Sequence, residues 1–168
     1  MNTSNFEWPP LKIVSGGQTG VDRAALDWAI QHNIAHGGWC PKGRLATDGP
    51  LPLRYHLSET QSSGYRQRTK LNVMNSDVTL ILNIGALDGG TLQTVKFAET
   101  LNRPHYVFQL DLSDLATIAE LIADWWQSLQ LQTLNIAGPR EEKRPGIYQA
   151  TRQTLDLCLL SRAMTSSA

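Results

Sequence analysis

The hydrophobic residues of this chain form two kinds of segment: short apolar runs, and longer stretches in which apolar positions recur every three or four residues. The short runs predict strands. The clearest is Asp77 to Leu82, which is nearly continuous, as in a strand buried on both faces of a parallel sheet. Further strands are expected at residues 11–14, 36–40, 105–110 and 133–137, with a short one at 55–57.

Helical spacing of apolar positions predicts five helices between and after these strands. The first begins at Val21, and Asn102-Arg103-Pro104 ends the third. Ser113 or Asp114 can cap the fourth. The expected helices cover residues 21–33, 64–75, 91–101, 115–129 and about 146 onward. Strands that alternate with helices imply an α/β fold, an open and mainly parallel sheet with helices on both faces.

The length of 168 residues suits one domain with a single core, so we expect one domain over residues 1–168. Residues 1–10 are expected to form a loose lead-in, and residues 164–168 a frayed tail. Basic and acidic residues number 15 each, so no global charge draws the chain to nucleic acid or an anionic membrane. No leader pattern, membrane-length apolar run or metal-spaced cysteine cluster is visible. We therefore expect a cytoplasmic protein.

The turn after the first strand carries the strongest candidate chemistry. Ser15-Gly16-Gly17-Gln18-Thr19-Gly20 has no bulky residue, and glycines let a backbone approach a phosphate closely. A strand, a Gly-rich turn and a helix aim free N–H groups and the positive helix end at an anion. The turn matches neither G-x-G-x-x-G nor G-x-x-x-x-G-K-[ST], so a standard NAD or ATP site is not supported. A bare turn is the alternative, against which the polar residues Thr19, Asp22 and Arg23 argue.

Several polar or Gly-rich segments follow an expected strand directly. They are residues 16–23, 41–44, 84–91 and 138–140. Because ligands of such sheets bind at the carboxyl ends of the strands, one crevice is expected to receive all four segments. The long loop over residues 42–62 would be its cover. An excess of basic residues between Lys42 and Lys70 favours a small anionic ligand.

Three motifs then occur in a recognisable order: Arg66-Gln67-Arg68-Thr69, Asn75-Ser76-Asp77 and Gly89-Gly90-Thr91-Leu92-Gln93-Thr94. This order resembles the Rossmann-like SLOG superfamily, which includes the cytokinin-activating LOG phosphoribohydrolases and the YpsA group. In that superfamily an arginine helix precedes a Ser/Ala-Asp strand and a P-G-G-x-G-T-x-x-E turn. Residues 16–23, 41–44 and 138–140 are most similar to its branch of molybdenum cofactor carrier proteins. The resemblance covers residues 13–160 and implies a Rossmann-like sheet.

The resemblance implies that Gly89-Gly90-Thr91 holds a phosphate at the start of a helix, and that Arg68 matches the hydrolase arginine. The hydrolase glutamate would fall at Thr94. Cleavage of an N-glycosidic bond passes through an oxocarbenium-like state that a carboxylate stabilises, and threonine cannot supply that charge. We therefore expect no acid beside Arg68 and favour a carrier over a hydrolase.

The hypothesis is non-enzymatic binding, protection and transfer of the molybdenum cofactor, an anionic phosphorylated pterin. Two Gly-rich nests would hold anionic oxygens, and basic side chains would donate charge-assisted hydrogen bonds. No catalytic or metal-ligating residue is expected. The expected cofactor-binding residues are Gly16, Gly17, Gln18, Thr19, Gly20, Asp22, Arg23, Lys42, Gly43, Arg66, Arg68, Asp88, Gly89, Gly90, Thr91, Thr94 and Arg140.

Other interpretations stay open. Asp22 could complement the helix dipole, and Asp88 could be a turn former. The function could be that of a LOG-like phosphoribohydrolase acting on nucleoside monophosphates, or of a module that senses nucleotide ligands. By analogy with the family, we expect a homodimer or homotetramer that passes its cofactor to molybdoenzymes.

Overall fold

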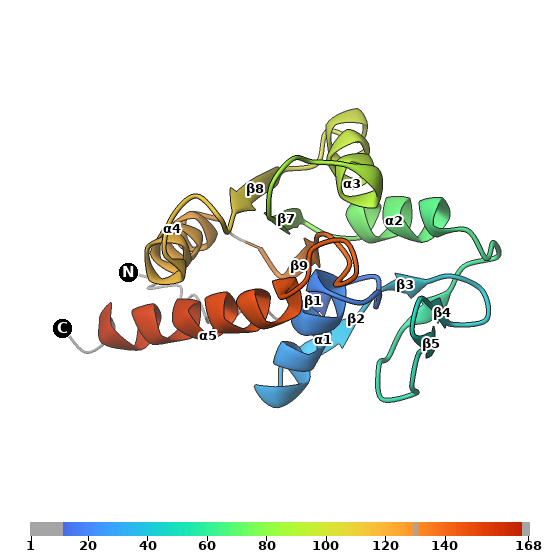
Figure 1. Cartoon of the computed structure of the whole chain (residues 1–168), viewed down its shortest axis with the longest axis horizontal. Coiled ribbons are helices and arrows are strands. Elements are labelled where there is room, and N and C mark those ends of the chain that lie inside the picture. Colours follow the sequence, from blue (N-terminus) through green and yellow to red (C-terminus); the bar gives the residue numbers. More distant parts are fainter. Residues whose placement is uncertain (1–11, 130, 166–168) are drawn as a thin grey trace, which may run out of the picture.

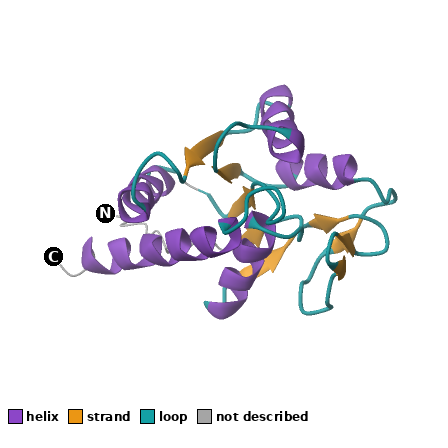
Figure 2. Cartoon of the chain, viewed as in Figure 1, coloured by secondary structure: helices purple, strands orange, loops and turns teal. Residues whose placement is uncertain are grey.

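The computed structural model describes residues 12–129 and 131–165, with side chains up to residue 161. The expected lead-in lies outside this range, as do residues 166–168 of the expected tail. Five strands form one parallel sheet in the order β2-β1-β9-β7-β8 (Figures 1 and 2). Their bounds are Lys12–Val14 (β1), Ala35–Gly37 (β2), Val78–Asn83 (β7), His105–Gln109 (β8) and Thr133–Ala137 (β9). The predicted open parallel sheet is confirmed.

Helices cover both faces of this sheet, again as predicted (Figure 1). One face carries α1 (Val21–Gln31), α4 (Leu115–Gln127) and α5 (Ile147–Thr165). The other carries α2 (Tyr65–Met74) and α3 (Gly89–Thr100). None of the described helices is long and apolar enough to cross a membrane.

The larger core lies under α1, α4 and α5. Apolar side chains of alternate positions along β7 and β9 point into it, among them Leu80 and Leu134, both fully buried. They pack against Trp28, Ile122 and Leu155 of the three helices. The smaller core on the opposite face is built by Val73, Phe97 and Ala98. The fourth helix is capped by Asp114, whose carboxylate accepts a hydrogen bond from the Thr117 N–H at 3.0 Å.

The last strand of the chain lies in the middle of the sheet. β9 pairs with β1 on one side and with β7 on the other. If the strands were counted from β9, their order would be 3-2-1-4-5, the usual order of a dinucleotide-binding fold. The chain therefore has a Rossmann-like sheet whose first βα unit is β9 with α5, at its C-terminal end. The loops after β1, β7 and β9 meet at one edge.

The expected single strand over residues 36–40 is wrong, because the chain breaks at Gly38. Gly38 has φ 129°, and a Cβ there would lie 2.3 Å from the Ser15 carbonyl oxygen, so only glycine fits. After it, β3 (Trp39–Cys40) leaves the sheet and pairs with β6 (Ser58–Glu59). The expected strand at residues 55–57 is also wrong; β6 begins one residue after it.

Residues 42–62 form a small lobe beside α1 that contains the hairpin of β4 (Leu45–Ala46) and β5 (Gly49–Pro50). The Arg44 guanidinium holds it together by donating to four backbone carbonyls at 2.8–3.2 Å. Tyr55 and its neighbours in the lobe pack against Leu26 of α1 in a second apolar cluster. The lobe is thus a folded part of the domain.

Candidate functional site

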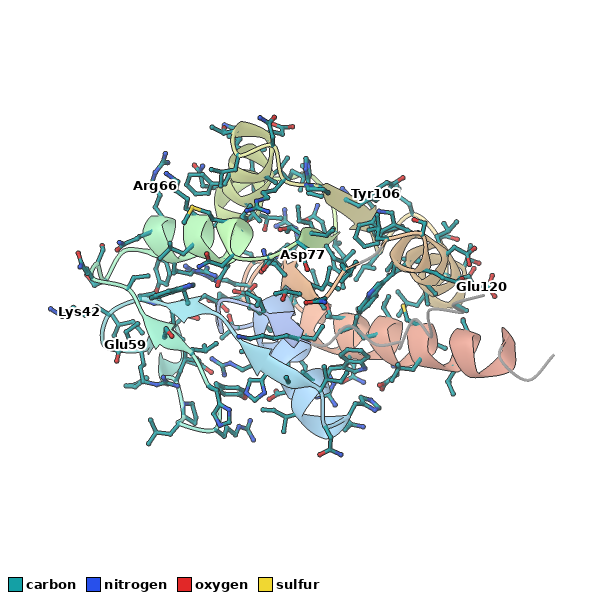
Figure 3. The ribbon with its side chains drawn as sticks, turned by 180° about the vertical axis from the view of Figure 1, so that it is seen from behind. Lys42, Glu59, Arg66, Asp77, Tyr106 and Glu120 are labelled. Carbon is teal, nitrogen blue, oxygen red and sulfur yellow. The ribbon has the colours of Figure 1, made fainter. Side chains whose placement is uncertain are left out.

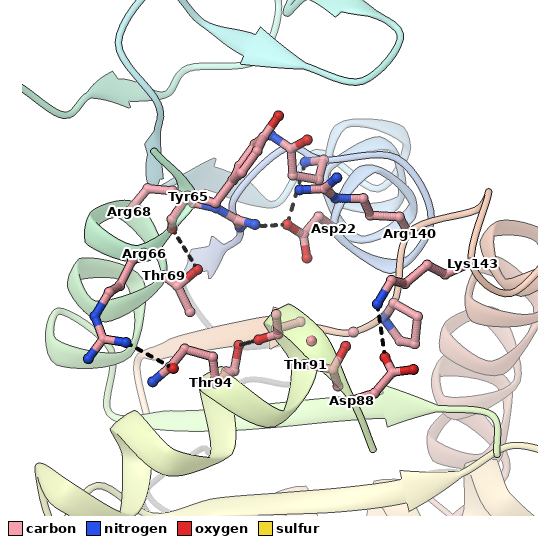
Figure 4. Close-up of a pocket in the computed structure, with 17 residues that line it drawn as sticks. Asp22, Tyr65, Arg66, Arg68, Thr69, Asp88, Thr91, Thr94, Arg140 and Lys143 are labelled. Atoms are coloured by element: carbon pink, nitrogen blue, oxygen red, sulfur yellow. Dashed lines mark hydrogen bonds and ion pairs between the residues drawn. The ribbon is translucent and has the colours of Figure 1, made fainter. Parts of the chain in front are cut away.

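A cavity of about 390 Å³ lies at the carboxyl ends of the central strands (Figure 4). The turn after β1 and the first turn of α1 contribute Gln18 and Asp22. Helix α2 contributes Tyr65, Arg66, Arg68 and Thr69. The turn before α3 and its first turns contribute Asp88, Gly89, Gly90, Thr91, Gln93 and Thr94. The loop after β9 contributes residues 137–140 and Lys143.

The most buried charges of the site are a pair at one wall of the cavity. Arg68 donates to a carboxylate oxygen of Asp22 at 2.9 Å, with side chains 12% and 4% exposed. Burial raises the pKa of Asp22, and the positive charge of Arg68 opposes that rise. Gly16 provides the space, because a Cβ there would lie 1.7 Å from an Arg68 nitrogen.

The expectation of no carboxylate beside Arg68 is therefore wrong. That expectation rests on position 94 of α3, where the resemblance to the hydrolases places a glutamate and this chain has Thr94. The acid in this cavity comes instead from the start of α1, 46 residues from Arg68 in sequence. Thr94 itself is buried, and its hydroxyl donates to the Gly90 carbonyl of its own helix at 2.9 Å. The nearest acid to Arg68 is thus Asp22.

Gln18 is next to Asp22 and has an acceptor atom without a donor. Its side-chain nitrogen donates to the Leu45 carbonyl at 2.9 Å, which fixes the amide orientation because a carbonyl can only accept. The amide oxygen is buried and has no hydrogen-bond partner among the described residues. The Nε of Arg68 is buried without a partner too. Native structures rarely leave buried polar atoms unpaired, so these two atoms indicate this wall as a candidate ligand contact.

The opposite wall is the N-terminus of α3 (Figure 4). Gly89 has φ 49°, and a Cβ added at Gly90 would meet no atom within 4 Å. This leaves the free N–H groups of the first helical turn open to a ligand. Lys143 lies beside them, since its Nζ would be 2.6 Å from a Cβ at Gly89. Lys143 and Arg144 also form ion pairs with Asp88 at 3.2 and 3.3 Å. The hydrogen bond from Lys143 is the main reason that the pKa of the Asp88 carboxyl is lowered.

Two further cations line the cavity from its rim. The Arg140 guanidinium lies 4.3 Å from the centre of the Tyr65 ring, a cation–π contact between the β9–α5 loop and α2. Arg66 donates to the Gln93 side chain at 3.1 Å. In total, four basic and two acidic side chains line the cavity, so its field favours an anion. The described residues contain no group of three His, Cys, Asp or Glu side chains that could hold a metal ion.

The structure brings ten of the predicted residues to the cavity and leaves seven outside its lining. Those inside are Gln18, Asp22, Arg66, Arg68, Asp88, Gly89, Gly90, Thr91, Thr94 and Arg140. Those outside are Gly16, Gly17, Thr19, Gly20, Arg23, Lys42 and Gly43. Tyr65, Thr69, Gln93 and Lys143 are lining residues that the sequence analysis did not select. The cationic pair Lys143-Arg144 soon after the Gly-Pro-Arg segment is the signal that could have indicated Lys143.

Two of the predicted residues outside the cavity, Thr19 and Arg23, have side-chain partners elsewhere. Thr19 donates to Glu142 at 2.6 Å, and Arg23 donates to both oxygens of Asp48 at 2.9 and 3.0 Å. Figure 3 shows Lys42 pointing away from the molecule. The lobe over residues 42–62 contributes no lining residue. It does not form the expected cover, and only three of the four strand-end segments meet in the cavity.

Comparison with known proteins identifies a matching family and a similar solved structure. The model of the family described as "Circularly permutated YpsA SLOG family" matches residues 13–159. A crystal structure of a "Putative molybdenum carrier protein" from Syntrophus aciditrophicus SB is 51% identical to this chain, with a TM-score of 0.87. The match covers 89% of this chain and 95% of that one. No curated protein matches.

Proposed function

The chain belongs to the circularly permutated YpsA SLOG family, and we propose that it binds the molybdenum cofactor as a carrier. The observation that carries this proposal is the cavity itself. Three strand-end loops converge on it, four cations line it, and its volume of about 390 Å³ suits one small ligand. The 51% identical protein named as a molybdenum carrier supports the choice of ligand.

The residues of the cavity fit the chemical needs of a phosphorylated pterin. The phosphate requires N–H donors and cations, which the first turn of α3 and Lys143 supply. The pterin ring requires acceptors for its N–H groups, and the unpaired amide oxygen of Gln18 is one. Arg140 and Arg66 add positive charge at the rim. When bound, the cofactor would bring a redox-active metal centre; this chain's residues hold and shelter it.

Anaerobic calorimetric titration with the cofactor tests the proposal. Wild-type protein should bind one cofactor per chain. Arg140→Ala should weaken binding by at least about tenfold, because one charge-assisted hydrogen bond is lost. Arg103→Ala is the matched control, since Arg103 is exposed and does not line the cavity. No binding by wild-type protein, or equal affinity of the two variants, would contradict the proposal.

A second function is favoured by one observation, the carboxylate of Asp22 beside Arg68 in the cavity. An acid whose pKa is raised by burial could assist cleavage of an N-glycosidic bond in a nucleoside monophosphate. Incubation with AMP and GMP separates the two functions. Release of free base at catalytic rates, abolished by Asp22→Asn, would establish a hydrolase. Cofactor binding without turnover would support the carrier.

We also propose that the protein is cytoplasmic, assembles as a homodimer or homotetramer, and delivers the cofactor to molybdoenzymes. Support for assembly comes from large apolar side chains on the outer helices, such as Leu121 of α4 and Leu160 of α5, 55% and 61% exposed. Light scattering during size-exclusion chromatography measures the assembly. A monomer at all concentrations would reject it.

A further inference from the structure

One wall of the cavity holds two acceptor atoms, Oε1 of Gln18 and Oδ1 of Asp22, to which none of the described residues donates a hydrogen bond. The Gln18 backbone N–H donates to Oδ2 of Asp22 at 3.4 Å, so the two residues are neighbours. The Gln18 amide oxygen is unpaired, and the residue is only 1% exposed. Gln18 and Asp22 both line the same cavity.

The two oxygens of the Asp22 carboxylate differ in their hydrogen bonds. Arg68 and the Gln18 N–H both donate to Oδ2. Oδ1 receives no hydrogen bond from any residue in the described part of the chain. The wall therefore contains an amide oxygen and a carboxylate oxygen that accept no hydrogen bond from the described residues, next to the likewise unpaired Nε of Arg68.

From this arrangement we infer that Gln18 and Asp22 recognise a heterocycle edge with two neighbouring donors, an amino group beside a ring N–H. Pterins and guanine have this edge. Adenine instead has an amino group beside a ring nitrogen with a lone pair, which would face an acceptor oxygen. The inference rests on the proposed function, because it places the ring of the phosphorylated ligand at this wall and its phosphate at α3. A site built to pair with ligand donors rejects a ligand that lacks them, since its buried acceptors stay unpaired.

Titration of wild-type protein with GMP and AMP tests this selectivity with ligands of equal phosphate charge. GMP should bind at least about tenfold more tightly than AMP, the equivalent of one buried hydrogen bond and a removed repulsion. Lys143→Ala should weaken both nucleotides by the same factor, because Lys143 lies at the α3 end of the cavity.

Asp22→Asn gives a sharper test. Arg68 can only donate, so it will hold the asparagine oxygen and turn the amide nitrogen toward the position of Oδ1. One acceptor thereby becomes a donor, and the preference for GMP should fall at least about tenfold or reverse toward AMP. Gln18→Leu removes the other acceptor without touching the Asp22–Arg68 pair and should also lower the preference. Thermal unfolding of each variant verifies that it is folded.

The outcomes separate this inference from the proposed function. Equal affinity for GMP and AMP, or an unchanged preference in both folded variants, overturns the selectivity but leaves cofactor binding standing. A GMP preference that both variants lose, in a protein that binds no cofactor, supports the selectivity and rejects the carrier. If neither nucleotide binds, the metal-free pterin phosphate replaces them as the probe. Asp22→Asn and Gln18→Leu should both lower the affinity for it, and unchanged affinity in both folded variants overturns the inference.

Discussion

The Arg68→Ala variant should lose more unfolding free energy, relative to wild type, at neutral pH than in mild acid. Arg68 is the counter-charge of Asp22, whose side chain is 4% exposed. Removing one partner of a buried ion pair leaves an uncompensated charge and costs about 3–5 kcal/mol of unfolding free energy. The loss should depend on pH, because the stranded carboxylate can take up a proton.

The sign of that dependence follows from the Asp22 pKa. Burial already raises it above the ordinary value of 3.8 with Arg68 present, and the loss of Arg68 removes the largest opposing effect. The folded Arg68→Ala variant therefore keeps a proton that the unfolded chain has released. Its stability should fall as the pH rises from about 4 through the folded pKa, and then level off.

Urea unfolding of wild-type protein and three variants, Arg68→Ala, Asp22→Asn and their combination, measures this effect. At about pH 8 the Arg68→Ala variant should lose the full 3–5 kcal/mol or so, and clearly less at about pH 5. The double variant should be less destabilised than the sum of the single variants, because it has no stranded charge. An equal loss at both pH values, or simple additivity, would refute the reasoning.

Three further predictions concern the turns around the cavity and the second lobe. Gly20→Ala should lower the unfolding free energy by roughly 1–3 kcal/mol from backbone strain alone, because Gly20 has φ 80° and a Cβ there would lie 2.3 Å from the Pro139 carbonyl oxygen; unchanged urea unfolding would contradict it. Gly90→Ala should leave stability unchanged or raise it by up to about 1 kcal/mol, yet weaken cofactor binding in titration, since the added methyl meets no protein atom but enters the lining of the cavity. His36 stacks on His56, and burial lowers the pKa of the His36 imidazole. The contribution of neutral His36 to the unfolding free energy should therefore be complete above about pH 6.5 and decline as the pH falls toward the folded pKa. Thermal unfolding measures this decline, which His36→Gln should reduce.

Local sequence pattern was enough to predict most of the fold. The strand over residues 133–137 has the predicted bounds, and α2 and β7 lie within one residue of theirs at each end. These segments carry strong signals of their own, such as the apolar run of β7. The position of β9 in the middle of the sheet carries no such signal, because strand order depends on contacts between distant segments. The break at Gly38 depends on a tertiary contact with Ser15.

In the candidate site, too, the sequence predicted individual residues but not the contacts between them. Asp22 and Arg68 were each selected from their own motifs, but their pairing could not be predicted from either motif alone. It depends on α1 and α2 meeting across the end of β1, with Gly16 leaving room for the guanidinium. The length of the segment over residues 42–62 predicts a functional loop, and the basic residues between Lys42 and Lys70 predict an anionic ligand. Arg44 instead uses its charge on backbone carbonyls within the lobe.

A crystal structure of the protein grown with the molybdenum cofactor under anaerobic conditions tests the central claim most directly. The account predicts the phosphate at the N–H groups of Gly89-Gly90-Thr91, beside Lys143, and the pterin edge at Gln18 and Asp22. A cofactor bound outside this cavity, or a pterin whose edge faces away from Gln18 and Asp22, would contradict it.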